Sequence, residues 1–381
     1  MTLYDGGPSA SATCPATNAN VFCTGGFGFF NGYQLVGGFT PGHTYFIRVW
    51  AGGQQNFASF DFCVQEVPPP PANDDCSGAT ELTVQPFGQT CTNAVTFNTA
   101  GATASSLPAA SCGGADVNDD VWLKFTATSA QHIFRFANEV QLLGSSSNLG
   151  MTLYDGGPSA SATCPATNSN VFCTGGFGFF NGYQLVGGFT PGNTYFIRVW
   201  AGGQQNFASF DFCVQAVPPP PPNDECTGAI PISLQSSALS CQTPITVNTA
   251  GSTQSVNKAD CQGTNTEDDV WFTFTAISSK IRMIYSDYQQ LLGSSSTVGY
   301  AIYKQTCPSG STALLCSNNF GFFGGKTILE GFEPGTTYLI RFWGPGNSNF
   351  ISFNMCIQAV IPPPNDECTT AIALATGAGF C

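Results

Sequence analysis

Short apolar runs, each bounded by Gly, Pro, Asn or Ser, are the dominant pattern along this chain. In one run Ala208, Phe210 and Phe212 fall on one side of an extended chain, and Ser209 and Asp211 fall on the other. Alternation with a period of two is typical of a half-buried β-strand. Strands are expected at residues 79–84, 94–98, 121–127, 131–137, 149–154, 169–173, 182–187, 193–200 and 206–214. Many short strands at regular spacing predict an all-β sandwich or barrel.

One expected strand is apolar on both faces. In 193–200, one face carries Tyr195, Ile197 and Val199, and the other carries Phe196, Arg198 and Trp200. This is more apolar surface than a simple two-sheet sandwich needs. We therefore expect the second face to make contacts beyond the single domain.

A repeat with an offset of 150 residues organises the chain. Residues 1–66 and 151–216 differ only at Ala19/Ser169, His43/Asn193 and Glu66/Ala216. A third, diverged copy follows, in which the Asp-Asp-Val-Trp motif of 119–122 returns at 268–271. Near-identity of two copies is more typical of a module that extends the length of a protein than of a unique active site.

Proline-rich segments separate the copies and act as semi-rigid spacers of the polyproline II type. The expected organisation is a truncated repeat at 1–66, a linker at 67–72, a full repeat at 73–216, a linker at 217–222, a full repeat at 223–359, a linker at 360–364 and the start of a further repeat at 365–381. Met1 aligns with the internal residue Met151, so we expect the parent array to be longer.

Composition narrows the function classes. Charged residues make up 9% of the chain and the formal net charge is −13, with no basic stripe. Nucleic acids and anionic membrane surfaces are therefore not expected as partners, because both call for patches of Lys and Arg. No apolar run approaches the ~20 residues of a membrane span, so membrane insertion is not expected either.

Seventeen cysteines indicate an oxidising compartment, because no CxxC or HxxxH metal motif accompanies them. This predicts an extracellular or cell-surface location. Proximity favours three hairpin pairs, Cys14–Cys23, Cys164–Cys173 and Cys307–Cys316, each nine residues apart. The pairing is left open for Cys63, Cys76, Cys91, Cys112, Cys213, Cys226, Cys241, Cys261, Cys356, Cys368 and Cys381.

Several motifs in order resemble one known family. They are the Asn-Asp-(Asp/Glu)-Cys opening at 73, 223 and 365, the Asp-Val-Trp-x-x-Phe-Thr-Ala strand at 120–127 and 269–276, and the Pro-Gly-x-Thr-Tyr-x-Ile-Arg strand. Together they resemble the Cys-rich bacterial pre-peptidase C-terminal domains of large secreted surface proteins. The resemblance implies tandem jelly-roll-like or immunoglobulin-like β-sandwich domains joined by Pro-rich linkers. It also implies an accessory, binding or structural module.

Two segments are candidate sites. Asp116, Asp119 and Asp120 form an acidic segment whose carboxylates suit Ca²⁺, and calcium is the one cofactor that this sequence suggests. The alternative is turn capping, with Asp120 paired to Arg198. A Gly-aromatic stretch, which recurs in the next copy, is a candidate interface. The alternative is a hairpin whose aromatic rings enter the core. Its residues are Phe177, Phe179, Phe180, Tyr183, Phe320, Phe322 and Phe323.

Two further features carry weaker alternatives. The segment 141–147 returns unchanged at 290–296 and is either a structural turn or a repeated contact loop. Trp50, Trp200 and Trp343 either close the edge of a sandwich core or form a platform on which sugar rings stack.

Catalysis has little support. His43 becomes Asn193 in the near-identical copy, and neither a GxSxG nor an HExxH motif occurs. The sequence predicts a non-enzymatic structural protein that forms an extracellular stalk, fibre or filament. Its expected partners are successive repeats or other copies of itself. The alternative is a cell-surface adhesin that binds glycan or protein through aromatic surfaces.

Overall fold

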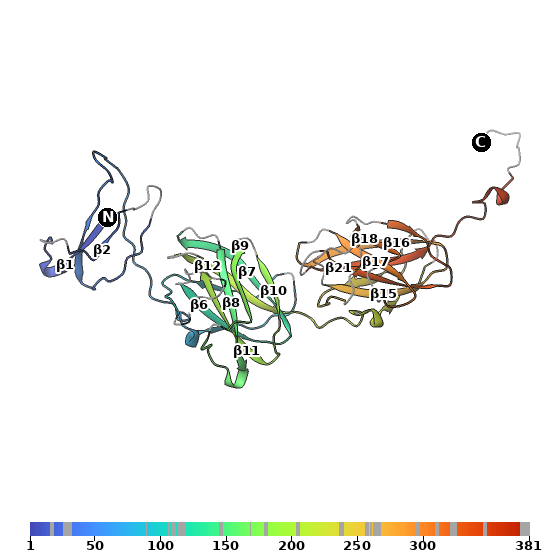
Figure 1. Cartoon of the computed structure of the whole chain (residues 1–381), viewed down its shortest axis with the longest axis horizontal. Helices are drawn as coiled ribbons and strands as arrows, with labels where there is room; N and C mark the ends of the chain where they lie inside the picture. Colours follow the sequence, from blue (N-terminus) through green and yellow to red (C-terminus); the bar gives the residue numbers. More distant parts are fainter. Residues whose placement is uncertain are drawn as a thin grey trace.

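The computed structural model follows the chain as three folded parts along its longest axis (Figure 1). It describes residues 1–15, 19–25, 33–88, 90–105, 107, 112, 119–144, 148–167, 169–178, 182–202, 206–235, 240–255, 259, 261, 268–294, 297–308, 312–320, 326–345 and 349–373. We call residues 1–66 the N-terminal unit, 73–216 the first domain and 223–359 the second domain. No helix among the described residues is long and apolar enough to cross a membrane.

The N-terminal unit contains one antiparallel sheet with strand order β2-β1-β3. Its strands are β1 (Thr2–Pro8), β2 (Phe22–Cys23) and β3 (His43–Arg48). The unit corresponds in sequence to the second half of the first domain. Trp50 and Phe57 are 44% and 99% exposed there, whereas their counterparts Trp200 and Phe207 are 1% and 4% exposed in the first domain, where residues 73–150 supply covering segments that residues 1–66 do not contain.

The first domain packs a five-stranded sheet against a four-stranded sheet, in the orders β4-β6-β11-β8-β9 and β10-β7-β12-β5. Its strands are β4 (Thr80–Glu81), β5 (Val95–Asn98), β6 (Asp120–Thr126), β7 (Gln131–Leu143), β8 (Asn148–Pro158), β9 (Phe172–Gly178), β10 (Tyr183–Gly187), β11 (Asn193–Ala201) and β12 (Phe207–Ala216). All its ladders are antiparallel except β4 with β6.

The second domain repeats this topology, with sheets β13-β15-β20-β17-β18 and β14-β21-β16-β19. Its strands are β13 (Ile230–Pro231), β14 (Ile245–Asn248), β15 (Asp269–Thr275), β16 (Lys280–Leu292), β17 (Val298–Lys304), β18 (Leu315–Phe320), β19 (Lys326–Glu330), β20 (Thr337–Trp343) and β21 (Phe350–Ala359). The single-turn 3-10 helices are η1 (Ser9–Ser11), η2 (Cys76–Gly78), η3 (Ser159–Ser161), η4 (Cys226–Gly228) and η5 (Cys368–Thr370).

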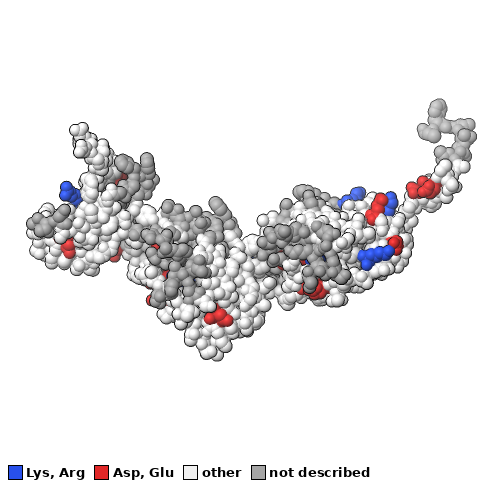
Figure 2. Space-filling view, viewed as in Figure 1, with Lys and Arg blue, Asp and Glu red and all other residues white. Residues whose placement is uncertain are grey.

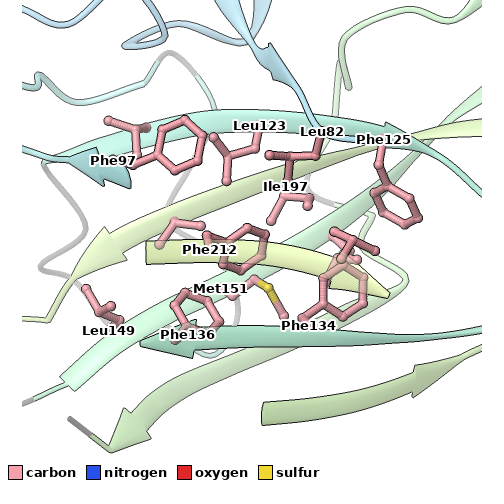
Figure 3. Packing of buried hydrophobic residues seen from close by; sticks show 14 of the residues in the cluster. Leu82, Phe97, Leu123, Phe125, Phe134, Phe136, Leu149, Met151, Ile197 and Phe212 are labelled. Carbon is pink, nitrogen blue, oxygen red and sulfur yellow. The ribbon is translucent and has the colours of Figure 1, made fainter. Parts of the chain in front are cut away.

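The core of each domain lies between its two sheets. In the first domain Phe134 and Phe212 from the four-stranded sheet meet Leu123, Phe125 and Ile197 from the other sheet (Figure 3). All five side chains are 0% exposed. The alternation along β12 puts every second residue into this core, as a half-buried strand requires. The all-β sandwich expected from the sequence is confirmed.

The second face of β11 is covered from within its own domain. Phe196 packs with Trp122 and Tyr154, and the segment around η2 lies over them. Trp200 is 1% exposed and lies directly over Gly150, where a Cβ atom would collide with the indole. The expectation that this face contacts something beyond the domain is therefore wrong. Chain segments of the same domain cover it instead.

The disulfides cross the domain rather than close hairpins. The described residues form Cys76–Cys164, Cys91–Cys213, Cys112–Cys173, Cys226–Cys307, Cys241–Cys356 and Cys261–Cys316. The favoured pairs Cys164–Cys173 and Cys307–Cys316 are wrong. In the first domain the register sets Cys173 opposite Thr152, twelve residues before Cys164, so the two sulfurs lie at different places on the sheet. Cys14 and Cys23 are exposed, and neither forms a disulfide within the described part of the chain.

Candidate functional site

An apolar cluster crosses the second proline linker and joins the two complete domains. Ile133 and Val217 of the first domain pack with Leu292 and Phe350 of the second, and these four side chains are 0–3% exposed. The ring of Phe87 meets that of Phe350 edge to face, with 5.9 Å between centroids. Burying a large apolar side chain stabilises a contact by about 1.5–3 kcal/mol. The cluster therefore favours one fixed arrangement of the two domains over independent motion.

Each end of this contact can be defined by its residues. The outgoing end of the first domain consists of Ile133, Tyr183, Leu185 and Val217, and the incoming end of the second consists of Asp268, Leu291, Leu292 and Phe350. In Figure 1, β10 and β21 flank the linker on its two sides.

Tyr183 is the polar centre of the outgoing end. The guanidinium of Arg135 lies 5.7 Å from the centroid of the Tyr183 ring. Arg135 is itself held by hydrogen bonds from its Nε to Gln215 Oε1 (2.6 Å) and from its Nη2 to the carbonyl of Gly88 (3.1 Å). Burial raises the pKa of Tyr183, and the carboxylate of Asp268 adds to this effect while Arg135 opposes it. The carboxylate of Asp268 in the next domain therefore lies within electrostatic range of the phenol.

The same contact occurs one junction earlier. Tyr33, the counterpart of Tyr183, donates a hydrogen bond from its hydroxyl to Asn206 Oδ1 of the first domain at 3.2 Å. Burial raises the pKa of Tyr33, and the carboxylate of Asp119 adds to it. Asp119 is the counterpart of Asp268. At two successive junctions, an aspartate of one unit thus lies within electrostatic range of a tyrosine of the preceding unit.

The unchanged segment 141–147/290–296 contributes to the incoming ends. Gln290 Nε2 donates hydrogen bonds to the carbonyls of Leu292 and Phe350, and Gln141 makes the same contacts in the first domain. Leu292 is 2% exposed at the complete junction. Leu291 beside it is partly buried in the same cluster, whereas its counterpart Leu142 is 48% exposed in the first domain, whose incoming end faces only the partial N-terminal unit. The segment ends a strand and also contacts the preceding domain, so both interpretations of it hold in part.

A buried ion pair lies on the outer face of each five-stranded sheet. Arg198 is 1% and Asp120 is 0% exposed, and Arg198 Nε donates to Asp120 Oδ2. Ser105 Oγ donates to the same carboxylate at 2.7 Å and accepts from Trp122 Nε1 at 2.7 Å. Burial raises the pKa of Asp120, and Arg198 opposes this shift. The second domain repeats the cluster with Asp269, Ser255, Trp271 and Arg341.

The acidic segment does not assemble a calcium site from the described residues. Asp120 is engaged by Arg198, which is the alternative that the sequence offered, and Asp119 lies at the incoming end. Asp116 lies outside the described residues. Within the described part of the chain, no group of three or more His, Cys, Asp or Glu side chains is placed to hold a metal ion.

The candidate aromatic interface is placed only in part. Phe179, Phe180, Phe322 and Phe323 lie outside the described residues. Phe177 lies on β9 and Phe320 on β18, with only their backbone described. Tyr183 lies on β10 at the outgoing end, where it contacts the next domain.

The tryptophan platform is excluded in the complete domains. Trp200 and Trp343 are 1% and 0% exposed, so neither offers a face to a sugar ring. A small open cavity of about 160 Å³ lies elsewhere on the second domain. Glu225, Ser255, Trp271, Cys226, Thr227, Cys307 and Pro308 line it. It neighbours the buried ion pair and holds polar groups beside an indole edge.

A family model described as galactose binding domain-like (GBD_T9SS_assoc) matches residues 72–214 and 222–355. Solved structures give distant matches. A Paenibacillus xanthan lyase is 14% identical over 71% of this chain and 25% of the lyase, with a TM-score of 0.19. Tripeptidyl peptidase 2 is 9% identical over 72% of this chain and 24% of the peptidase, with a TM-score of 0.20. The chain thus spans about a quarter of each. A search of curated proteins found no match.

The family match corrects the resemblance seen in the sequence. The repeats are not pre-peptidase C-terminal domains but copies of a related β-sandwich. Tandem domains of this family, braced by six disulfides among the described residues, fit an extracellular surface protein. The chain belongs to the T9SS-associated galactose-binding-domain-like family, of which it carries two tandem copies.

Proposed function

We propose that this chain is part of an extracellular stalk in which consecutive domains are locked end to end. The observation that carries the proposal is the apolar cluster of Ile133, Val217, Leu292 and Phe350 across the linker. A linker between independent domains needs no such contact, because inter-domain surfaces are ordinarily more polar and permit motion. The tyrosine–aspartate contact at two successive junctions supports a repeated, directional arrangement.

Disulfides and surface composition support the same proposal. In the chain-entropy description, closing loops of 55 to 122 residues stabilises each domain by about 4 kcal/mol per disulfide. Charged residues make up only 9% of the chain, so trypsin-like proteases have few cleavage sites. These are properties of a part that bears load outside the cell.

We also propose that the domains are not catalytic. His43 Nδ1 lies 3.0 Å from Asp5 Oδ1, and in the near-identical copy Asn193 Nδ2 donates to Asp155 Oδ1 at 3.1 Å. The replacement preserves the contact and removes a proton-transfer group. The histidine position therefore serves the strand pairing of β1 with β3.

Small-angle X-ray scattering of the full chain tests the stalk. The double variant Ile133→Arg/Tyr183→Lys places charged residues at the junction, and both substitutions copy residues that the second domain carries at the same positions, Arg282 and Lys326. In about 500 mM NaCl, where an ion pair at the junction is screened, we expect the wild type to scatter as one stiff elongated particle and the variant to give a broader distribution of maximum dimensions. Ile277→Lys, at a turn residue that is 56% exposed, is the control. Identical curves for all three proteins would remove the support that the cluster gives.

Glycan binding is the second candidate, because a cavity beside Glu225, Ser255 and Trp271 exists in a galactose-binding-like domain. A carboxylate and a hydroxyl beside an aromatic edge suit sugar hydroxyls. The test is a glycan array with the wild type and with Glu225→Gln. A signal lost in the variant supports an adhesin, and no signal with either protein rejects this candidate.

A further inference from the structure

The two complete domains carry different chemistry at their outgoing ends. The strand register sets Tyr183 opposite Arg135 in the first domain and Lys326 opposite Ile284 in the second. The same registers place Arg282 where the first domain has Ile133. An apolar outgoing end with a tyrosine is thus replaced by a cationic one.

The outgoing end of the second domain is exposed and mostly basic. It consists of Lys280, Arg282, Lys326, Ile328 and Glu330. Ile328 is 53% exposed, and Lys280 Nζ lies 2.8 Å from Glu330 Oε1. Figure 2 shows Lys and Arg side chains on this domain and none on the first domain in the same view. Among the described residues, Arg282 and Lys326 have no acidic partner in the strand pair of β16 and β19, whereas Lys280 has Glu330.

The incoming ends have the opposite character. Asp119 and Asp268 lie there, each 5–7% exposed, and each is near enough to the tyrosine of the preceding unit to raise the pKa of its phenol. A carboxylate near the position of a phenol attracts an ammonium group placed there instead, because the two charges are opposite. The cationic outgoing end and the acidic incoming end are therefore complementary.

A further copy of the repeat begins directly after the second domain. Beyond the linker at 360–364, Asn-Asp-Glu-Cys at 365–368 repeats the opening at 223–226. The hydrogen bond and charge of Glu330 raise the pKa of Lys280, and the carboxylate of Asp366 adds to this. The amide of Val360 donates to the carbonyl of Lys280 at 3.0 Å, so the linker to the further copy starts from the outgoing end.

We propose that the outgoing end of the second domain binds the incoming end of a further copy of this repeat, through an ion pair between Lys326 and the aspartate corresponding to Asp268. The inference rests on the stalk proposed above and adds a second class of joint to it. An exposed ion pair is weak and is screened by salt, whereas the apolar joint between the two complete domains is not. The array therefore combines salt-resistant joints with a salt-sensitive one.

The test uses the full chain extended after Cys381 by a second copy of residues 242–359, which completes the further copy that begins at residue 365. Spin-labelled amino acids replace two residues. One is Leu314, which is 44% exposed, and the other is the residue of the further copy that corresponds to Ile277. Double electron–electron resonance then gives the distance distribution across the ionic joint in about 20 mM and about 500 mM NaCl. We expect a narrow distribution at low salt that broadens about twofold at high salt, where charges more than ~4 Å apart are screened.

Two variants separate the ion pair from other causes. Lys326→Glu should broaden the distribution at low salt. Lys326→Tyr with Arg282→Ile copies the first domain and should give a narrow distribution at both salt concentrations. A second label pair, at Ser161 and Leu314, reports the joint between the two complete domains in the same extended chain. A broad distribution at both salt concentrations, or a narrow one that Lys326→Glu leaves unchanged, overturns the ionic joint. The stalk proposal fails only if the Ser161–Leu314 distribution is itself broad.

Discussion

Acid should destabilise the first domain more than the second, because the first domain buries His132. The imidazole is 0% exposed and lies between the rings of Phe125 and Phe189, with centroids 5.1 and 5.2 Å away. Its Nε2 accepts from the amide of Thr128 at 3.3 Å, and Nδ1 has no hydrogen-bond partner among the described residues. Burial lowers the pKa of His132 to about 4 from an ordinary value of 6.5.

The sign of the effect depends on which state binds the proton. Below pH 6.5 the unfolded chain protonates His132 and the folded domain does not, so the free energy of unfolding falls as the pH falls. The loss stops near pH 4, where the folded domain also takes up the proton. Each pKa unit corresponds to about 1.4 kcal/mol, which gives about 3 kcal/mol for the full shift. An assay at about pH 4.5 spans about two of these units, so the expected loss there is about 2–3 kcal/mol.

The second domain is an internal reference. Ile281 stands where the first domain has His132, and it is also 0% exposed. Each domain has a buried aspartate in its ion pair, Asp120 in the first and Asp269 in the second. Each also has an exposed aspartate whose pKa is lowered by side-chain hydrogen bonds, Asp211 in the first and Asp287 in the second. Burial also raises the pKa of one glutamate in each domain, Glu139 in the first and Glu225 in the second, so His132 is the main titrating difference between the two domains.

Pulse proteolysis in urea at about pH 7 and about pH 4.5 measures both domains in one sample, because the linker at 217–222 separates their fragments. We expect the urea midpoint of the first domain to fall more than that of the second. His132→Ile should remove the difference and raise the midpoint at neutral pH, since it also removes an unpaired buried nitrogen. Equal pH dependence of the two domains in the wild type would refute the reasoning.

Three further outcomes are expected. Arg341→Met should lower the free energy of unfolding of the second domain, measured in urea, by about 3–5 kcal/mol, because Asp269 is left buried without its cation. Adding Asp269→Asn to this variant should recover part of the lost free energy. Gly150→Ala should cost the first domain about 1–3 kcal/mol in the same assay, because the added methyl group collides with the indole above it, and no loss would mean that the indole moves aside freely. Replacing Cys76 and Cys164 with Ser should lower the melting temperature of the first domain alone in calorimetry, whereas an unchanged melting temperature would contradict the observed pairing.

Local patterns are sufficient to predict most of the strands. Alternation places β6, β10 and β11 within one or two residues, because each has one face in the core. It does not predict the second half of β7. Asn138 takes a positive φ of 53° there, and the register to β12 shifts, so the alternation breaks although the strand continues to Leu143.

Pairings between distant segments cannot be predicted in the same way. Cys164 and Cys173 are close in sequence, but their partners Cys76 and Cys112 are brought by loops that cover the outer face of the sheet. Proximity along the chain is therefore a poor guide to disulfides in a sandwich, where the covering segments come from the other end of the domain.

The junction is also hidden from reasoning on a single repeat, because it needs two ends from two domains. One signal in the sequence points to it. The segment 290–296 is identical to 141–147 although its flanks have diverged, and its leucines contact the preceding domain. A structural turn alone does not require two leucines at its entrance, so their retention carries information about the neighbour.

The most direct test of the stalk is the distance distribution between spin labels at Ser161 and Leu314 in the unextended chain. Both positions lie on the described surface, one on each complete domain. The account predicts a single narrow distribution in the wild type, independent of salt, that broadens in about 500 mM NaCl when Ile133→Arg and Tyr183→Lys are introduced together. A broad distribution in the wild type, equal to that of the double variant, would contradict the claim that the apolar cluster fixes the two domains end to end.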